Sequence, residues 1–191
     1  MKIDFLLNIW LHSREEAPGL WRFAVDWART TSHPDDHLWL HYGLTLLYYP
    51  FFRACVAAMD QYGRYEDYIT TRRLIRHLAA DLGQLGSLER SVQRVVASLR
   101  DWGALADAER RYAYIPKTQS FISENLDVQS WLLACALHAH PAEELPFADL
   151  LRLPELFPFR FTVGLAELQA APWFIVQRQG ASWDMVRLRN P

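Results

Sequence analysis

The chain has 191 residues, of which 51% are hydrophobic and 22% are charged, and its formal net charge is −2 at pH 7. This length and composition allow a substantial core and argue against an intrinsically disordered protein. Cys55 and Cys135 are far apart in apolar surroundings, so neither a disulfide framework nor a thiolate metal site is expected. The N-terminus carries Asp4 within its apolar stretch and no small-residue cleavage site, so we expect a cytoplasmic protein without a signal peptide.

Residues 1–49 are predicted to form an N-terminal helical segment. Two short aromatic-rich helices are expected over residues 3–12 and 18–29, and a third over 34–48 begins with Pro34 in its first turn. The aromatic residues are dense for such short helices, which indicates a core and, in part, a contact with another subunit. A homodimer and a complex with partner protein subunits are both left open by this pattern.

The run from Leu38 to Met59 is apolar enough to resemble a membrane span. His41, Pro50 and Arg53 interrupt it, and a proline after two tyrosines breaks a helix. We therefore expect two soluble helices that meet at Pro50, and no membrane partner.

Residues 50–117 are predicted to form a second region with a defined order of elements. Thr70 is expected to cap the N-terminus of one helix, Ser87 that of the next, and Gly103 is expected just beyond the end of the latter. The expected elements are a helix from Pro50 to about Tyr62, a strand at 65–69, a helix after Thr70, a turn at 82–87, a helix at 88–102, and a hairpin of 104–106 with 111–115 around a tip at 107–110.

The helix at 88–102 has two contrasting faces. Its apolar residues recur in steps of four and three, which predicts one buried stripe; these are Leu88, Val92, Val95, Leu99 and Trp102. At about 100° per residue, the opposite side carries Arg90, Gln93, Arg94 and Ala97, flanked by Ser91, Ser98 and Arg100. This outward face is cationic, carries one amide and has little bulk. Residues 64–117 hold ten Lys or Arg against seven Asp or Glu, so a modest basic region lies within an otherwise acidic chain.

Residues 118–191 are predicted to repeat this order in a degenerate form. A hairpin is expected around a turn at Arg178 to Ala181, with strands that start at Trp173 and Ser182. The expected helices are one capped by Asp127 that continues to about Ala139, one from Pro146 to Pro154, and one over 161–170. The last of these offers only Thr162, Glu167 and Gln169 as polar groups, which favours a packing or partner surface over contact with phosphate.

The segment from Tyr68 to Ile115 resembles a winged helix-turn-helix DNA-binding domain, and the C-terminal third resembles a degenerate second copy. The run from Leu38 to Leu105, a helix pair followed by a helix-turn-helix that ends in Trp-Gly, is also similar to the small DNA-binding subunit of BREX phage-defence systems. These resemblances imply a mainly α fold with small β-hairpin wings, in which an N-terminal helical segment precedes two winged helix-turn-helix modules.

Such a fold implies a non-enzymatic protein that binds double-stranded DNA, as a transcription regulator or as the DNA-binding subunit of a bacterial defence complex. Arginine can bond guanine and glutamine can bond adenine in the major groove. The expected DNA-binding residues are Arg90, Gln93, Arg94 and Ser98 on the reading helix, Arg72, Arg73 and Arg76 at phosphates, and Arg110 and Arg111 on the wing. The alternative is a tandem winged-helix protein-interaction subunit without DNA contact, similar to the acidic accessory subunits of condensin-like complexes.

Catalytic and metal sites are not expected. His33, His37 and His41 are four residues apart, a spacing that can hold a metal on a helix, but Pro34 places His33 before the helix start. Arg72 and His77 have the spacing of one class of small ribonucleases, yet lie on different faces of a helix. We therefore predict no catalytic residue, no cofactor and no small-molecule substrate.

Overall fold

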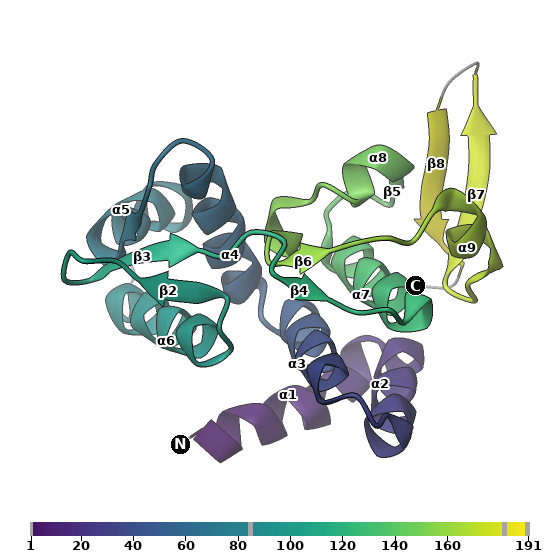
Figure 1. The fold of residues 1–191 in the computed structure, drawn as a ribbon, viewed down its shortest axis with the longest axis horizontal. Coiled ribbons are helices and arrows are strands. Elements are labelled where there is room, and N and C mark those ends of the chain that lie inside the picture. Colours follow the sequence, from purple (N-terminus) through teal and green to yellow (C-terminus); the bar gives the residue numbers. More distant parts are fainter. Residues whose placement is uncertain (1, 84–85, 181–182, 190–191) are drawn as a thin grey trace. The chain divides into compact units, whose positions relative to one another are not determined.

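The computed structural model describes residues 2–83, 86–180 and 183–189 (Figure 1). It is mainly helical, with small sheets, and divides into two compact units. Unit 1 comprises Met1–Pro50, Ser123–Arg152 and Phe161–Pro191, and unit 2 comprises Phe51–Ile122 and Leu153–Arg160. Residues 1–49 and most of residues 118–191, which the sequence suggests as separate segments, therefore contribute to the same unit.

The helices and strands follow one another along the chain as labelled in Figure 1. The order is α1 (Lys2–Glu16), α2 (Pro18–Thr30), α3 (Pro34–Tyr48), α4 (Pro50–Gly63), β1 (Ile69–Thr70), α5 (Thr71–Leu82), α6 (Leu88–Asp101), β2 (Leu105–Asp107), β3 (Ala113–Pro116), β4 (Phe121–Ile122), α7 (Leu126–Ala139), β5 (Glu144–Pro146), α8 (Phe147–Leu150), η1 (Pro154–Leu156), β6 (Phe159–Arg160), α9 (Leu165–Ala170), β7 (Phe174–Gln179) and β8 (Trp183–Leu188).

Unit 1 is built around the contact of α3 with α7. Gly43 on α3 allows this close approach, because a Cβ atom there would lie 2.5 Å from Cζ3 of Trp131, which is fully buried on α7. The indole nitrogen of Trp131 donates a hydrogen bond to the carbonyl oxygen of Leu20 at 2.9 Å. Every residue of α7 from Val128 to Leu137 is buried, so this helix is surrounded by protein along most of its length.

Two buried polar side chains link distant segments of unit 1. The carboxylate of Asp36 accepts hydrogen bonds from the indole of Trp27, the hydroxyl of Thr31 and the hydroxyl of Ser123, at 3.0–3.1 Å. The amide oxygen of Gln129 accepts from the backbone nitrogens of Thr162 and Val163, at 2.7 and 3.0 Å. Because these polar groups are satisfied, their burial is compatible with a stable core.

Unit 2 contains a three-stranded antiparallel sheet with the order β1-β3-β2, preceded and interrupted by helices. Ile69 pairs with Tyr114, and Leu105 pairs with Pro116, so the predicted hairpin is present with slightly shifted ends. The predicted strand over 65–69 is wrong for all but its last residue. Thr70 caps α5 as predicted, because its hydroxyl accepts a hydrogen bond from the backbone nitrogen of Arg73 at 3.3 Å.

The helix α6 ends in a Schellman motif. Gly103 has a positive φ of 79° and donates to the carbonyl of Arg100, while the nitrogen of Ala104 donates to Leu99 at 2.8 Å. At the other end Ser87 occupies the N-cap position, but its side chain accepts no capping hydrogen bond from the described residues. The buried stripe differs from the prediction by one position, because Val96 is buried and Val95 is half-buried.

The last third of the chain corrects several predictions. Asn125, not Asp127, caps α7, since the Asn125 side chain accepts from the nitrogens of residues 127 and 128. The helix predicted from Pro146 is helical only over 147–150. The helix predicted over 161–170 starts at 165, because the backbone nitrogens of residues 162 and 163 bond the side chain of Gln129 outside the helix. The turn predicted at Arg178 to Ala181 is wrong at its start, because β7 continues through Gln179, which pairs with Trp183. Ala181 and Ser182 lie outside the described residues.

The same order of elements occurs twice. We call residues 50–116 the first repeat and residues 126–188 the second repeat. Each runs helix, strand, helix, helix, strand, strand, apart from η1 and β6 between the two later helices of the second repeat. The sheets have equivalent orders, β1-β3-β2 and β5-β8-β7, so the first strand of each pairs with the last. None of the helices in the described ranges has both the length and the apolar character of a membrane span.

Candidate functional site

The outward face of α6 is open to solvent. Arg90, Gln93, Arg94 and Ala97 are all exposed, whereas Ser98 is half-buried. Within the part of the chain that the structure describes, no hydrogen bond or ion pair engages the side chain of Arg90 or Arg94. Two guanidinium groups are therefore free to meet an anionic ligand.

Acidic neighbours modify this face. Glu89 is exposed in the first turn of α6, and its carboxylate accepts a hydrogen bond from the amide nitrogen of Gln93 at 3.1 Å. The guanidinium of Arg100 bonds Asp107 on β2 at 2.5 Å, and this hydrogen bond raises the pKa of Arg100. Arg100 therefore joins the end of α6 to the sheet, while Glu89 places one negative charge beside the free arginines.

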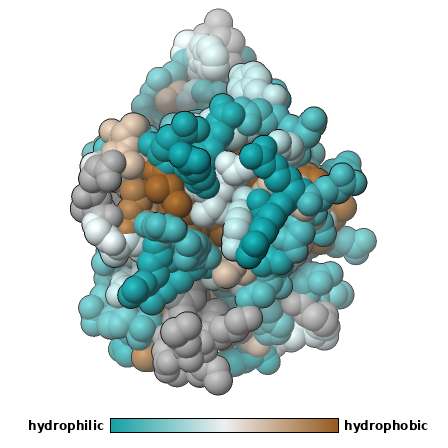
Figure 2. Space-filling model, turned by 90° about the vertical axis from the view of Figure 1, so that its left-hand side faces the viewer, coloured by the Kyte–Doolittle hydropathy of each residue, from teal (hydrophilic) through white to brown (hydrophobic). Residues whose placement is uncertain are grey.

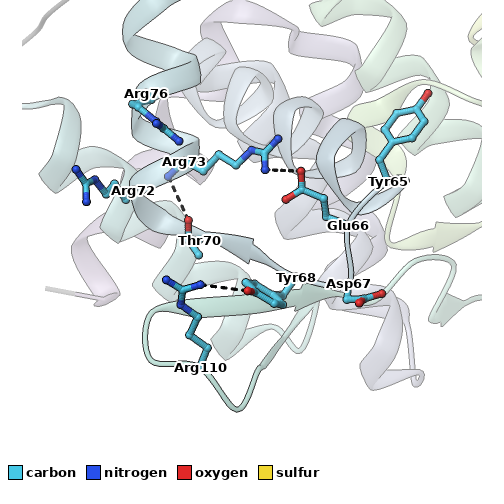
Figure 3. A pocket seen from close by; sticks show the side chains of 9 residues that line it. All are labelled: Tyr65, Glu66, Asp67, Tyr68, Thr70, Arg72, Arg73, Arg76 and Arg110. Atoms are coloured by element: carbon cyan, nitrogen blue, oxygen red, sulfur yellow. Dashed lines mark hydrogen bonds and ion pairs between the residues drawn. The ribbon is translucent and has the colours of Figure 1, made fainter.

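A second cationic feature lies around the start of α5 (Figure 3). We call it the arginine hollow. It is an open concavity of about 690 Å³, in which four guanidinium groups stand against two carboxylates. Its lining residues are Tyr65, Glu66, Asp67, Tyr68, Thr70, Arg72, Arg73, Arg76 and Arg110. The hollow therefore unites four of the predicted site residues, three from α5 and one from the β2–β3 loop.

Two of these arginines are held in place by other side chains. Arg73 forms an ion pair with Glu66, and its guanidinium carbon lies 4.5 Å from the centre of the Tyr62 ring. Arg110 donates a hydrogen bond to the hydroxyl of Tyr68 at 3.2 Å. Figure 3 shows these two contacts on opposite walls of the hollow. The backbone supports the same arrangement, because the nitrogen of Thr71 donates to the carbonyl of residue 112 in the loop.

The other arginines near the hollow are exposed. Arg72 and Arg76 extend from α5 without an ion pair to any described residue. Arg111 is exposed on the β2–β3 loop and its guanidinium carbon lies 4.8 Å from the centre of the Tyr112 ring. The loop itself is tightly turned, since Tyr112 has a positive φ of 58°. Arg111 is thus at the loop tip, outside the lining of the hollow.

Figure 2 turns toward the viewer the side of Figure 1 on which α5, α6 and the β2–β3 loop are drawn. This surface is mainly hydrophilic, and its hydrophobic area is confined to small patches. A face of this kind suits a charged, hydrated ligand better than an apolar one.

Sequence reasoning missed the contribution of residues 65–68 to the hollow. They were expected in a strand, but only Ile69 and Thr70 pair with β3, so this segment is a turn that places Tyr65 and Tyr68 at the rim. The signal that could have indicated it is a pair of acidic residues flanked by two tyrosines, shortly before the helix cap at Thr70. Glu89 was also missed, although it lies one helical turn before Gln93 and bonds its side chain.

His41, Cys55 and His77 are each at least partly buried. His41 accepts a hydrogen bond at Nδ1 from the indole of Trp10 at 2.9 Å, and burial lowers its pKa. Burial raises the pKa of Cys55 to about 12. His77 lies 3.5 Å from the carboxylate of Asp81 and packs edge-on against Tyr62. No three His, Cys, Asp or Glu side chains of the described ranges are grouped as metal ligands.

The equivalent helix of the second repeat has a different surface. α9 is six residues long, and its exposed polar residues are Glu167 and Gln169. Glu167 accepts a hydrogen bond from the backbone nitrogen of Gly164 at 3.1 Å, so it serves to begin the helix. No arginine or lysine stands on α9. The first repeat therefore presents exposed arginines on its third helix, and α9 presents no basic residue.

Comparison with known proteins adds no relative: no family model, no curated protein and no solved structure matches this chain.

Proposed function

We propose that this chain is a non-enzymatic protein that binds double-stranded DNA through its first repeat. The observation that carries the proposal is the outward face of α6, where Arg90 and Arg94 are exposed and engage no described residue. The order of elements, with a hairpin after α6 and β1 paired to β3, supports a winged helix-turn-helix arrangement. In that arrangement the helix before the hairpin enters the major groove.

The chemistry of α6 suits the edges of base pairs. Arg90 and Arg94 each present a two-pronged guanidinium that matches the O6 and N7 atoms of guanine. Gln93 can bond adenine after it exchanges its hydrogen bond to Glu89 for one to the base. Ala97 has a small side chain, which allows the groove floor to approach the helix, and Ser98 stands at the edge of this face, half-buried.

The phosphate contacts come from the flanking elements. Arg72 and Arg76 extend from the first turns of α5, and Arg73 lies between them, restrained by Glu66. Arg110 and Arg111 stand on the β2–β3 loop, where a wing touches the neighbouring backbone or the minor groove. Phosphate contacts of this type give affinity and fix the register without reading sequence.

Two cellular roles fit this activity, namely transcription regulation and DNA binding within a bacterial defence complex. A homodimer would recognise a pseudo-palindromic site, because each copy would read one half-site. The identity of neighbouring genes separates the two roles: a methyltransferase or an ATPase gene beside this one favours the defence complex.

Duplex binding measured over a series of salt concentrations tests the proposal. We expect log K to fall linearly with log salt, with a slope of roughly −0.9 for each neutralised phosphate. The double variant Arg90→Ala/Arg94→Ala should bind more weakly and with a flatter slope. The matched control is Arg22→Ala/Arg29→Ala, which removes the same charge from exposed positions on α2. An equal slope in the wild type and the α6 double variant would remove this helix from the interface.

The alternative is a protein-interaction subunit of a larger assembly that makes no direct DNA contact. The acidic balance of the chain outside residues 64–117 favours it, as does the absence of basic residues from α9. This function predicts no salt-dependent duplex binding, so the same titration distinguishes the two.

A further inference from the structure

The arginine hollow differs in shape from the face of α6. On α6 the arginines project from a convex helix, whereas in the hollow four arginines line a concave space of about 690 Å³. Pockets of roughly 300–1,000 Å³ suit compact small molecules. The outer surface of a duplex presents its phosphates as a convex wall, which touches the rim of such a hollow but does not fill it. The hollow therefore has room for a ligand smaller than a duplex.

The charges in the hollow are arranged for a phosphate group. Arg73 and Arg110 are held by Glu66 and Tyr68, so two guanidinium groups are already oriented before a ligand arrives. Preorganised donors of this kind lose little entropy on binding. Arg72 and Arg76 are exposed and add two further positive charges. The carboxylate of Glu66 is neutralised by Arg73, which leaves Asp67 as the opposing charge.

An exposed aromatic ring stands at the rim of the hollow. Tyr65 is 88% exposed, and its ring contacts no other aromatic ring among the described residues. Bases in a duplex are stacked on one another and do not reach a ring beside the phosphate wall. An unpaired base can stack on such a ring, and proteins that bind single strands combine aromatic rings with a cationic groove. No such ring stands on the exposed face of α6.

We propose that the arginine hollow binds the phosphate of an unpaired nucleotide, with its base on Tyr65. The nucleotide is either the end of a DNA strand that extends from the duplex or a free nucleotide. The strand-end form rests on the proposed function, because α6 would bring the duplex to the hollow. The preferred DNA is then a duplex with a single-stranded overhang.

The experiment compares four probes by fluorescence anisotropy: a blunt duplex, the same duplex with a short 5′-phosphorylated overhang, the overhang strand alone, and a deoxynucleoside monophosphate as competitor. We expect the overhang to increase affinity at least about fivefold, since stacking of one base contributes roughly 1–3 kcal/mol. The variants Tyr65→Ala and Arg72→Gln/Arg76→Gln should lose this gain. Arg90→Ala/Arg94→Ala should weaken both duplexes and keep the gain.

The four probes distinguish a strand end from a free nucleotide. They also distinguish failure of this proposal from failure of the proposed function. Competition by the monophosphate assigns a free-nucleotide site, and its absence together with the overhang gain assigns a strand end. Equal affinity for the blunt and overhang duplexes, with no binding of the single strand or of the monophosphate, would overturn the proposal, as would a gain that survives in Arg72→Gln/Arg76→Gln. If the blunt duplex does not bind at all, the proposed function fails, and binding of the single strand and the monophosphate still decides the hollow. Asp67→Asn, which removes a repelling charge, should strengthen binding of the overhang.

Discussion

The first and second repeats have the same order of elements and equivalent sheets, but their third helices differ in length and in the side chains that they expose. In the first repeat, α6 is 14 residues long and exposes Arg90 and Arg94. In the second, α9 is six residues long and exposes Glu167 and Gln169. The first helices differ as well, because α7 is buried almost throughout, whereas α4 keeps exposed positions at its ends.

This difference shows that two repeats with the same order of elements can expose different side chains on equivalent helices. The second repeat contributes to the core of unit 1 through Trp131 and Gln129, so its residues are constrained by packing. The first repeat places its polar groups on the surface, where arginines can accumulate. We therefore expect the binding surface on the first repeat, whose polar residues are less constrained by packing.

Reversing the charge on α6 should have the largest effect on duplex affinity. We expect Arg90→Glu/Arg94→Glu to lower duplex affinity at least about 30-fold, because loss of one arginine at a base typically costs about 1–3 kcal/mol and the new carboxylates also repel phosphates. Two glutamates introduced on α9 of the second repeat, Ala166→Glu/Gln169→Glu, should leave the affinity within about twofold. Anisotropy with one duplex at constant salt measures both. A similar loss in the two variants would show that the repeats do not differ as proposed.

A change in the packing of α3 against α7 should have the next largest effect, on stability. We expect Gly43→Ala to lower the free energy of unfolding by about 1–3 kcal/mol, since the new methyl group would overlap the buried Trp131 ring. Gly19→Ala is the control, because a Cβ atom there meets nothing within 4 Å. Denaturant unfolding measures stability, and anisotropy should show unchanged duplex affinity in the folded variant. An affinity that falls with stability would mean that the second repeat takes part in binding.

A smaller change should improve the α6 face. We expect Glu89→Gln to strengthen duplex binding several-fold, because it removes a negative charge beside Arg90 and weakens the contact that holds Gln93. The same substitution should cost about 0.3–1 kcal/mol of stability, since Glu89 interacts favourably with the helix N-terminus. Anisotropy and thermal unfolding check the two effects. Unchanged or weaker binding at low salt would place Glu89 away from the phosphates.

The smallest expected effect is a pH dependence of unit 1. Burial, with the charge of His37 as the lesser cause, lowers the pKa of His41 below its ordinary value of 6.5. The unfolded chain then binds the proton more readily, so the contribution of His41 is complete above pH 6.5 and is lost as the pH falls through 6.5 toward the folded pKa. Unfolding measured at about pH 7.5 and about pH 5.5 should show this loss. His41→Gln keeps an acceptor for Trp10 and should reduce it; an equal loss in the variant would assign it to other groups.

Local patterns were sufficient for much of the fold. Pro34 and Pro50 predicted helix starts, Thr70 a cap and Gly103 a helix end, because each acts through its own backbone geometry or a hydrogen bond to near neighbours. The exposure of Arg90 and Arg94 followed from helical periodicity alone.

The features that were missed depend on partners distant in sequence. Gln129 prevents residues 162 and 163 from joining α9, and no pattern in that segment indicates it. The arginine hollow forms only when the β2–β3 loop meets the start of α5, where Arg110 bonds Tyr68. Sequence reasoning therefore found the arginines but not the concavity that they line.

The most direct measurement is the mapping of duplex contacts by nuclear magnetic resonance on the ¹⁵N-labelled protein. On addition of duplex DNA, we expect the largest changes at the side-chain Nε–H groups of Arg90 and Arg94, smaller changes at Arg72 and Arg76, and none at the backbone of α9. Changes confined to the second repeat, or no change at α6 while the duplex is bound, would contradict the central claim that the exposed cationic face of α6 lies against DNA.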